Sequence, residues 1–81
     1  LTANDCMEEF MFLGLRMMKG VSSRRFLKLF NKNINDVYAE PLEENIKNNL
    51  LCKYRDDSGV WYCLTPHGID ISNTVMADFM L

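Results

Sequence analysis

Histidine is scarce in this sequence, since His67 is the only one. Asp70 follows three residues later and would share a helical face with it. Zinc sites in proteins need three or four converging ligands, and carboxylate oxygen cages need a dedicated loop. We therefore expect His67 to be a surface residue near the start of a helix. We assign no metal-binding residue to this chain.

Cysteine is also limited, with three residues and no C-x-x-C pair. Cys52 and Cys63 flank a predicted hairpin and would lie nearly opposite each other, so a structural disulfide between them is one alternative. The odd number of cysteines, counting Cys6, and the lack of an export signal favour the other alternative. In that case all three are free thiols that act as small apolar residues.

Long apolar runs are absent. The longest, at residues 10–15, is much shorter than the roughly 20 residues that span a bilayer. No cationic segment leads into an apolar run, so nothing indicates export. We expect a cytoplasmic protein. Because the chain begins at Leu1 rather than at methionine, we also expect it to be a segment of a longer polypeptide.

The patterns of common active sites are missing as well. The sequence has no nucleophile triad, no glycine-rich phosphate loop and no carboxylate pair placed for acid–base chemistry. We therefore assign no catalytic and no cofactor-binding residue, and we expect the chain alone not to be an enzyme. It also lacks repeats and linkers, and a length of 81 residues suits one domain. We predict a single domain over residues 1–81.

The charges that are present are unevenly distributed. The net charge is −2, yet every charged residue within residues 10–35 is basic. These residues are Arg16, Lys19, Arg24, Arg25, Lys28 and Lys32. The remainder of the chain carries three basic and eleven acidic residues. A candidate basic patch follows from this asymmetry, and it consists of Lys19, Arg24, Arg25 and Lys28.

The first predicted helix begins near Asn4 or Asp5 and ends at Gly20. Asp5 and Glu8 have the spacing of a capping box, and Gly20 suits the left-handed conformation that terminates helices. At about 100° per residue, one side of this helix is apolar. Its residues are Met7, Phe10, Met11, Gly14, Met17 and Met18. The opposite side carries Asp5, Glu8, Glu9, Arg16 and Lys19.

Phe12 falls in the middle of the charged side, with Leu13 at its edge. One interpretation is that Phe12 is an ordinary exposed aromatic residue. The other is that Phe12, Leu13 and Arg16 contact another domain, since such interfaces have mixed polarity. Arg16 has its own alternative, because it could be solvated or paired with Glu9. In either interpretation, Phe12→Ser should leave the stability of this chain nearly unchanged.

Two further helices are predicted next. Ser22 is a good N-cap for a helix over residues 23–31. Its predicted buried edge is Phe26, Leu27 and Phe30. Pro41 disfavours a helical Glu40 and suits the first position of a third helix, which runs to about Asn49. The predicted inner face of the third helix is Leu42, Ile46 and Leu50. Its predicted outer face is Glu43, Glu44, Asn45, Lys47 and Asn48.

Residues 51–55 and 60–64 predict two strands around a turn at residues 56–59. Thr65 and Pro66 suit the N-cap and first position of a last helix. Its predicted apolar arc is Ile69, Ile71, Val75, Met76, Phe79 and Met80. The predicted fold class is therefore mainly α with a small β-hairpin. Three helices, a two-stranded wing and a C-terminal helix form a winged-helix-like order.

A winged helix suggests DNA binding, but the charges disfavour it. The third helix of such folds usually enters the major groove, and Lys and Arg contact the phosphates. Here that helix exposes Glu43 and Glu44 against one Lys47, and the hairpin tip adds Asp56 and Asp57 against Lys53 and Arg55. The predicted recognition surface is net acidic, so we expect DNA not to be the partner.

Two stretches have a more specific pattern. The first is Glu9-Phe10-Met11-Phe12-Leu13-Gly14-Leu15-Arg16, followed by Gly20-Val21-Ser22 and Phe26. The second is Leu64-Thr65-Pro66-His67-Gly68, followed by Asn73 and Phe79. Together with Tyr38 and Leu50-Leu51, these resemble the C-terminal domain of the oxygen-independent coproporphyrinogen III oxidase family, which comprises radical S-adenosylmethionine proteins and related heme chaperones. The resemblance covers nearly the whole chain in order.

Two positions depart from the pattern of this family. Asn31 stands where the family usually has glycine after the second-helix Phe, and Asn49 stands where it has glycine before Leu-Leu. Asparagine is the best substitute for glycine in a left-handed backbone conformation. We therefore expect both residues to adopt that conformation and the fold to be retained.

The resemblance implies a division of labour. In the family, an upstream barrel carries a C-x-x-x-C-x-x-C motif that holds a 4Fe-4S cluster and binds S-adenosylmethionine, and none of its cysteines is present here. This chain would be an accessory domain that packs beside that barrel near the substrate opening. The parent would be an oxidoreductase that decarboxylates coproporphyrinogen III, or a non-catalytic chaperone that delivers heme. The alternative of another class is a stand-alone winged-helix protein that binds nucleic acid or a protein partner.

Overall fold

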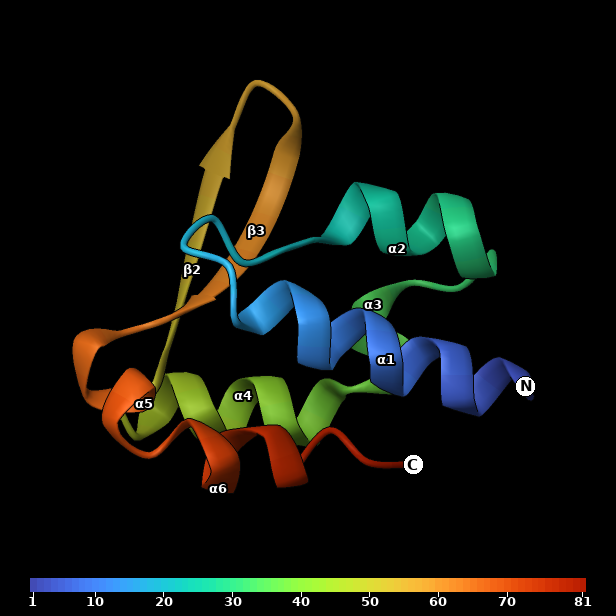
Figure 1. Ribbon diagram of the computed structural model, residues 1–81. Helices are drawn as coiled ribbons and strands as arrows, with labels where there is room; N and C mark the ends of the chain where they lie inside the picture. The colour runs from blue at the N-terminus through green and yellow to red at the C-terminus, as the bar shows by residue number, and fades with distance from the viewer.

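A computed structural model of the chain describes residues 1–81, in which helices pack beside a small antiparallel sheet whose long hairpin projects away from them (Figure 1). The helices are α1 (Ala3–Leu15), α2 (Ser23–Phe30), α3 (Ile34–Val37), α4 (Ala39–Lys47), α5 (Pro66–Asp70) and α6 (Ser72–Ala77). The strands are β1 (Val21–Ser22), β2 (Leu51–Asp56) and β3 (Gly59–Leu64), in the order β1-β3-β2. The predicted fold class, mainly α with a small hairpin, is confirmed. The winged-helix assignment stays a prediction.

Helix α1 begins and ends earlier than predicted. Thr2, not Asn4 or Asp5, is the N-cap, and it forms a capping box with Asp5. The helix stops at Leu15 because the next five residues turn the chain onto the sheet, where Val21 pairs with Tyr62. Gly20 makes this turn possible with φ of +86°, since a side chain there would collide with the carbonyl group of Tyr62.

The early end of α1 corrects the predicted apolar side. Met7 and Met11 are buried as predicted, but Met17 and Met18 lie in the turn and are 66% and 100% exposed. A helical wheel places residues correctly only where the chain is helical. The two methionines therefore belong to the surface rather than to the core.

Helix α2 follows the local prediction closely. The Ser22 hydroxyl accepts a hydrogen bond from the Arg25 amide at 3.1 Å, and Asn31 ends the helix with φ of +55°. The left-handed conformation predicted for Asn31 is thus confirmed. The buried edge is Phe26 with half-buried Phe30, whereas Leu27 is 43% exposed and was wrongly placed in the core.

The aromatic rings of α2 explain that difference. Phe10 on α1 packs edge-on against Phe26, with ring centroids 5.4 Å apart, and against Phe30 at 5.8 Å. This triangle of rings fills the junction of α1 and α2. Leu27, one position further around the helix, faces away from it.

Helix α4 begins at Ala39, so Glu40 is helical and the predicted start at Pro41 is wrong. Proline is tolerated at the third position because the first amides of a helix have no partner within it. The short helix α3 ends at Val37, directly before Tyr38, which is the N-cap of α4. At the other end, Asn49 has φ of +61°, which confirms its predicted left-handed conformation.

The inner face of α4 contains a polar residue that the helical wheel placed outside. Asn45 is only 2% exposed, while Ile46, predicted to be inside, is 36% exposed. The side-chain amide of Asn45 donates to the carbonyl of Pro41 at 2.7 Å and to the carboxylate of Asp78 at 3.2 Å. These bonds satisfy the amide and allow its burial.

The hairpin is one residue longer on each strand than predicted. Asp56 pairs with Gly59, which leaves a two-residue turn. Leu51 and Tyr62 are buried on the inner face of the sheet, and the Tyr62 hydroxyl donates to the side chain of Asn35 at 3.0 Å. Cys52 and Cys63 are direct cross-strand partners, as predicted.

The predicted last helix is two helices. Thr65 caps α5 through the amide of Gly68 and Pro66 is its first residue, as predicted, but Ile71 breaks the helix with φ of −122° and ψ of +36°. Gly68 lies against the carbonyl group of Leu50 with no room for a side chain. The bend divides the predicted apolar arc. Val75, Met76 and Phe79 are buried, whereas Ile69, Ile71 and Met80 are exposed.

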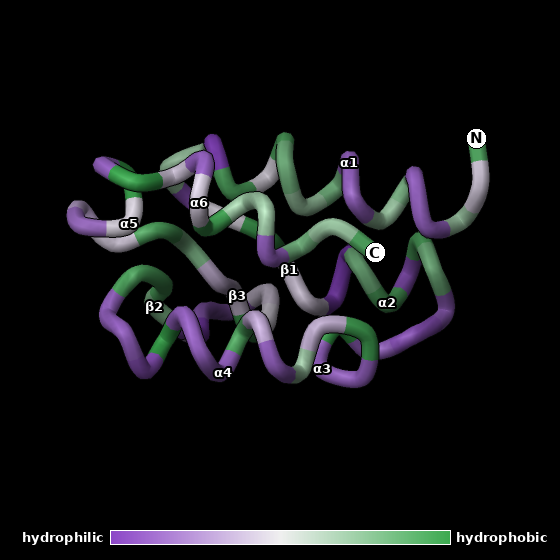
Figure 2. The backbone as a smooth tube through the Cα atoms, turned by 90° about the horizontal axis from the view of Figure 1, so that it is seen from below, coloured by the Kyte–Doolittle hydropathy of each residue, from purple (hydrophilic) through white to green (hydrophobic).

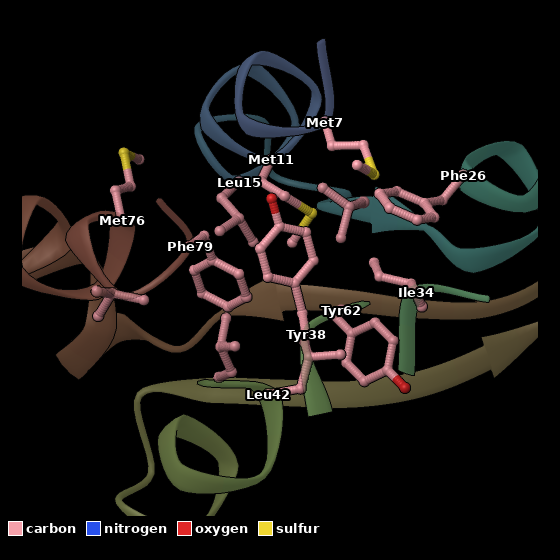
Figure 3. Packing of buried hydrophobic residues seen from close by; sticks show 13 residues of the cluster. Met7, Met11, Leu15, Phe26, Ile34, Tyr38, Leu42, Tyr62, Met76 and Phe79 are labelled. Atoms are coloured by element: carbon pink, nitrogen blue, oxygen red, sulfur yellow. The ribbon is translucent and has the colours of Figure 1, made fainter. Parts of the chain in front are cut away.

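One hydrophobic cluster joins these elements beneath α1 (Figure 3). Its members are Met7, Met11, Leu15, Val21, Phe26, Ile34, Tyr38, Leu42, Leu51, Tyr62, Val75, Met76 and Phe79. Hydrophilic residues dominate α4 and the link from α2 to α3 (Figure 2). The fold thus buries one side of α1 and leaves the segment that follows Leu15 at the surface.

Tyr38 stands at the centre of this cluster with its phenolic oxygen directed toward α1 (Figure 3). The side chain is 1% exposed, and its hydroxyl has no hydrogen-bond partner. Burial, with a smaller effect of the Glu8 charge, raises the pKa of Tyr38 to about 12. The hydroxyl therefore remains protonated in the folded chain over the physiological range.

Candidate functional site

The three residues predicted to contact another domain do not share one surface. Leu13 is 56% exposed and Arg16 is exposed just after α1. Phe12 is half-buried and packs against the core cluster, so its predicted exposed position is wrong. It lies one turn from Glu8, whose carboxylate accepts a hydrogen bond from the amide of Leu81. The C-terminal segment thus lies beside this face of α1, which the sequence pattern alone did not indicate.

Leu13 instead lies on an apolar groove between α1 and α2, with a volume of about 530 Å³. Its apolar lining includes Cys6, Phe10, Leu13, Met17, Leu29, Phe30 and Trp61. Glu9 and Arg25 add one charge of each sign. We call this the α1–α2 groove.

A second groove, of about 350 Å³, lies on the other side of the turn that follows α1. Its lining is Leu15, Arg16, Met17, Met18, Leu64, Pro66, Ile69, Ser72 and Met76. We call this the α1–α5 groove. Met17 lines both grooves, so the segment from Leu13 to Met18 forms an apolar ridge between them. Arg16 places a positive charge on this ridge.

The turn after the ridge is fixed to the outer face of the hairpin. The Lys19 ammonium lies 3.8 Å from the carboxylate of Asp56 and 4.6 Å from the ring centre of Trp61. The Tyr54 hydroxyl donates to the Lys19 carbonyl at 2.7 Å, and the Tyr54 and Trp61 rings are stacked with an interplanar angle of 10°. These contacts hold the turn in one position, so the ridge is presented by an ordered segment.

The carboxylate of Asp56 is itself well satisfied. It accepts hydrogen bonds from the hydroxyl of Ser58 at 2.6 Å and from the indole nitrogen of Trp61 at 2.9 Å. The Ser58 hydroxyl contributes most to lowering the pKa of Asp56, and Lys19 contributes less. Asp56 therefore remains ionised and available to Lys19 at neutral pH.

The candidate basic patch is divided among several surroundings. Lys19 is engaged by Asp56 and Trp61. Arg24 lies beside Gly59 and lines a cavity of about 230 Å³ on the other side of the hairpin, and Arg25 lines the α1–α2 groove. Lys28 is exposed at the end of α2. The four side chains thus have different partners and line different cavities, while Arg24 and Lys28, four residues apart in α2, share one face of that helix.

No group of three or more His, Cys, Asp or Glu side chains is placed to hold a metal ion. His67 and Asp70 are both exposed. The residues present therefore do not fit a 4Fe-4S cluster, which needs cysteine thiolates that converge on it. None of the helices has the length and apolar content that crossing a bilayer requires.

Comparison of the sequence with known proteins shows which family it matches. The family model for the HemN C-terminal domain matches residues 1–71. Two curated relatives, each named heme chaperone HemW, come from Bacillus subtilis (strain 168) and Lactococcus lactis subsp. lactis (strain IL1403). They are 30% identical over 80 residues and 33% identical over 81 residues.

These alignments cover 99% and 100% of this chain but 20% of each relative. The chain thus spans about a fifth of the length of the curated relatives it matches. No solved structure matches it.

Proposed function

The chain belongs to the family of HemN C-terminal domains, and from this premise we propose that it is the accessory domain of a longer HemN-like polypeptide. In this proposal the ridge from Leu13 to Met18, together with the two grooves beside it, docks on the upstream part of the same polypeptide. The domain contributes no ligand or catalytic group. It contributes a rigid surface that stabilises the upstream part and positions it.

The observation that carries the proposal is the apolar ridge. Leu13, Met17 and Met18 are 56%, 66% and 100% exposed on one continuous segment, and each lines a groove. Contiguous apolar surface edged by charge is typical of an interaction site. Contacts between domains of one chain have this mixed polarity, and here Glu9, Arg16 and Arg25 supply the charges.

The small fraction of each relative that this chain covers supports the proposal that its docking partner belongs to the same polypeptide. About four fifths of each curated relative lies outside the matched region, so a partner within the same polypeptide is at hand. A covalently linked partner has a high effective concentration, and a modest apolar interface is then enough for docking.

For the parent protein we propose heme handling. Both curated relatives are named heme chaperone, and they align with 99% and 100% of this chain at 30% identity or more. The resemblance to oxygen-independent coproporphyrinogen III oxidases keeps a decarboxylating oxidoreductase as the second candidate. In either case the 4Fe-4S cluster and S-adenosylmethionine would belong to the upstream part, because the cysteines of this chain do not fit a cluster.

A binding experiment tests the docking. The 81-residue chain is titrated by calorimetry into the parent polypeptide truncated before Leu1. We expect measurable association, weakened at least about tenfold by Leu13→Asp or Met17→Asp. Met80→Asp is the matched control, since Met80 is 63% exposed and lines neither groove. If all three variants bound like the parent sequence, the ridge would not be the docking surface.

The stand-alone alternative makes the opposite prediction. A winged-helix protein that acts alone would have no barrel encoded upstream and would bind duplex DNA with a steep salt dependence. Reading the open reading frame upstream of Leu1 separates the two candidates. A barrel with a C-x-x-x-C-x-x-C motif supports the accessory role, and a start codon directly before Leu1 contradicts it.

A further inference from the structure

Cys52 and Cys63 occupy directly opposed positions on the two long strands of the hairpin. Side chains alternate between the two faces of a strand, so both thiols lie on the face opposite to buried Leu51 and Tyr62. Both are free thiols; Cys52 is exposed on the edge strand β2, and Cys63 is half-buried on the central strand β3. Of the three cysteines, these two are the pair that the strand ladder places face to face.

We propose that Cys52 and Cys63 form a reversible dithiol–disulfide site that responds to small-molecule disulfides such as oxidised glutathione. The proposal concerns the hairpin alone and does not depend on docking or on the proposed function. In the reduced state the thiols are free, and in the oxidised state they link β2 to β3.

Strand geometry makes closure possible within the native fold. The Thr65 amide donates to the Leu50 carbonyl, so by the two-residue alternation of the ladder Cys52 and Cys63 are a hydrogen-bonded pair, in which Cα atoms are about 5.5 Å apart. The corresponding distance in disulfides is about 4.4–6.8 Å, with Cβ atoms about 3.5–4.5 Å apart. Opposed Cβ atoms of a hydrogen-bonded pair lie toward the wide end of about 4.5–5.5 Å, so closure requires a local contraction of about 1 Å and leaves the disulfide strained. Such a constrained, accessible disulfide is easily reduced, which makes the site reversible.

The different exposure of the two thiols gives the order of events. The exposed Cys52 thiolate attacks oxidised glutathione, forms a mixed disulfide and releases one glutathione thiolate. The Cys63 thiol then loses its proton to solvent, and its sulfur attacks the Cys52 sulfur and releases the second glutathione. The protein loses two protons and two electrons, and one glutathione disulfide becomes two thiols. Burial, together with the neighbouring Cys52, raises the pKa of Cys63, which keeps this thiol protonated and disfavours it as the first nucleophile.

The next pair on the same face provides a reporter. Tyr54 and Trp61 are opposed two residues along the ladder from the cysteine pair, and Trp61 is the only tryptophan in the chain. Closure of the disulfide beside these stacked rings will change the environment of Trp61. The emission of Trp61 therefore follows oxidation without any label.

The test uses the 81-residue chain with Cys6→Ser, which removes the third thiol. Reduced protein is equilibrated in a series of glutathione buffers, quenched with an alkylating reagent and weighed by mass spectrometry. We expect an intramolecular disulfide, seen as a loss of about 2 Da relative to the reduced thiols, with no retained glutathione. Far-UV circular dichroism should stay unchanged while Trp61 emission shifts.

The matched control moves one thiol by one residue. The variant Cys52→Ser with Lys53→Cys places a thiol on the opposite face of the sheet, at an exposed position. Its equilibrium constant for closure with Cys63 should be at least about tenfold lower, and it should retain glutathione instead. Equal closure in both proteins would overturn the proposal. So would a stable mixed disulfide at Cys52 in the Cys6→Ser chain, or closure that requires denaturant.

Discussion

The side-chain amide of Asn45 in α4 donates a hydrogen bond to the carboxylate of Asp78, which follows α6, with 3.2 Å between nitrogen and oxygen. The two residues are 33 positions apart in the sequence. The same amide donates to the carbonyl of Pro41 within α4. One buried polar side chain thus connects the middle of the chain to its C-terminal helix.

Replacing this side chain should cost stability. Asn45→Ala removes both hydrogen bonds at a 2% exposed position and leaves a small cavity. We expect the free energy of unfolding in urea to fall by about 1–3 kcal/mol. Asn48→Ala, at the exposed end of the same helix, is the control and should change it by less than about 0.5 kcal/mol. Equal effects of the two changes would show that the buried amide is not a structural link.

Phe12 and Leu13 form a second matched pair. Phe12→Ser removes a half-buried ring that packs against the core, so the chain should lose about 1–3 kcal/mol of stability. Leu13→Ser, at a 56% exposed position, should change stability by less than about 0.5 kcal/mol. Thermal unfolding of the two variants measures this. If Phe12→Ser caused no loss of stability, as the sequence alone predicted, the Phe12 ring would have to be exposed.

The buried hydroxyl of Tyr38 should not stabilise the folded chain at neutral pH. It has no hydrogen-bond partner, so Tyr38→Phe should leave stability unchanged or raise it by up to about 1 kcal/mol. Tyr62→Phe is the control, because its hydroxyl donates to Asn35 and the change should cost about 1 kcal/mol. Urea unfolding at pH 7 compares the two variants.

Tyr38 should also make the stability of the folded chain depend on pH in the alkaline range. The pKa of Tyr38 rises from 10.0 in the unfolded chain to about 12 in the folded chain. Between these values the unfolded state binds fewer protons, so stability is fully present below pH 10 and falls as pH rises toward 12. A shift of this size corresponds to about 3 kcal/mol. Tyr38→Phe should remove that part of the decline, and parallel profiles for both proteins would contradict the assignment.

Gly20 and Gly59 allow two reasons for requiring glycine to be separated, namely a positive φ and a lack of space for a side chain. Both have positive φ, of +86° and +110°. A methyl group at Gly20 would also collide with the Tyr62 carbonyl, whereas at Gly59 the nearest atom is the Arg24 guanidinium at 3.5 Å. Gly20→Ala should therefore lower the free energy of unfolding by at least about 3 kcal/mol and Gly59→Ala by about 1 kcal/mol. Similar losses would mean that backbone strain alone sets the requirement.

Local rules predicted the parts of this fold that depend on a few neighbouring residues. Ser22 and Thr65 are N-caps, Asn31 and Asn49 are left-handed, and Cys52 opposes Cys63, all as the sequence indicated. Caps and hairpin partners are determined by bonds within a few residues. They therefore need no knowledge of the packing.

The wrong predictions concern residues whose burial, or whose place in a helix, depends on packing between segments that are distant in the sequence. Met17 was assigned to the core because α1 was expected to continue to Gly20, yet pairing of β1 with β3 ends the helix at Leu15. Asn45 was assigned to the surface because its partner, Asp78, lies far along the chain. The two grooves could not be predicted either, since each depends on the placement of elements from distant parts of the sequence.

The central claim is that the ridge from Leu13 to Met18 docks on the rest of a longer polypeptide. Hydrogen–deuterium exchange of the full-length protein, compared peptide by peptide with the 81-residue chain, tests it most directly. We expect residues 13–20 to exchange more slowly in the full-length protein, while the exposed side of α4 exchanges equally in both. Equal exchange at residues 13–20, with protection appearing elsewhere on the domain, would contradict the account.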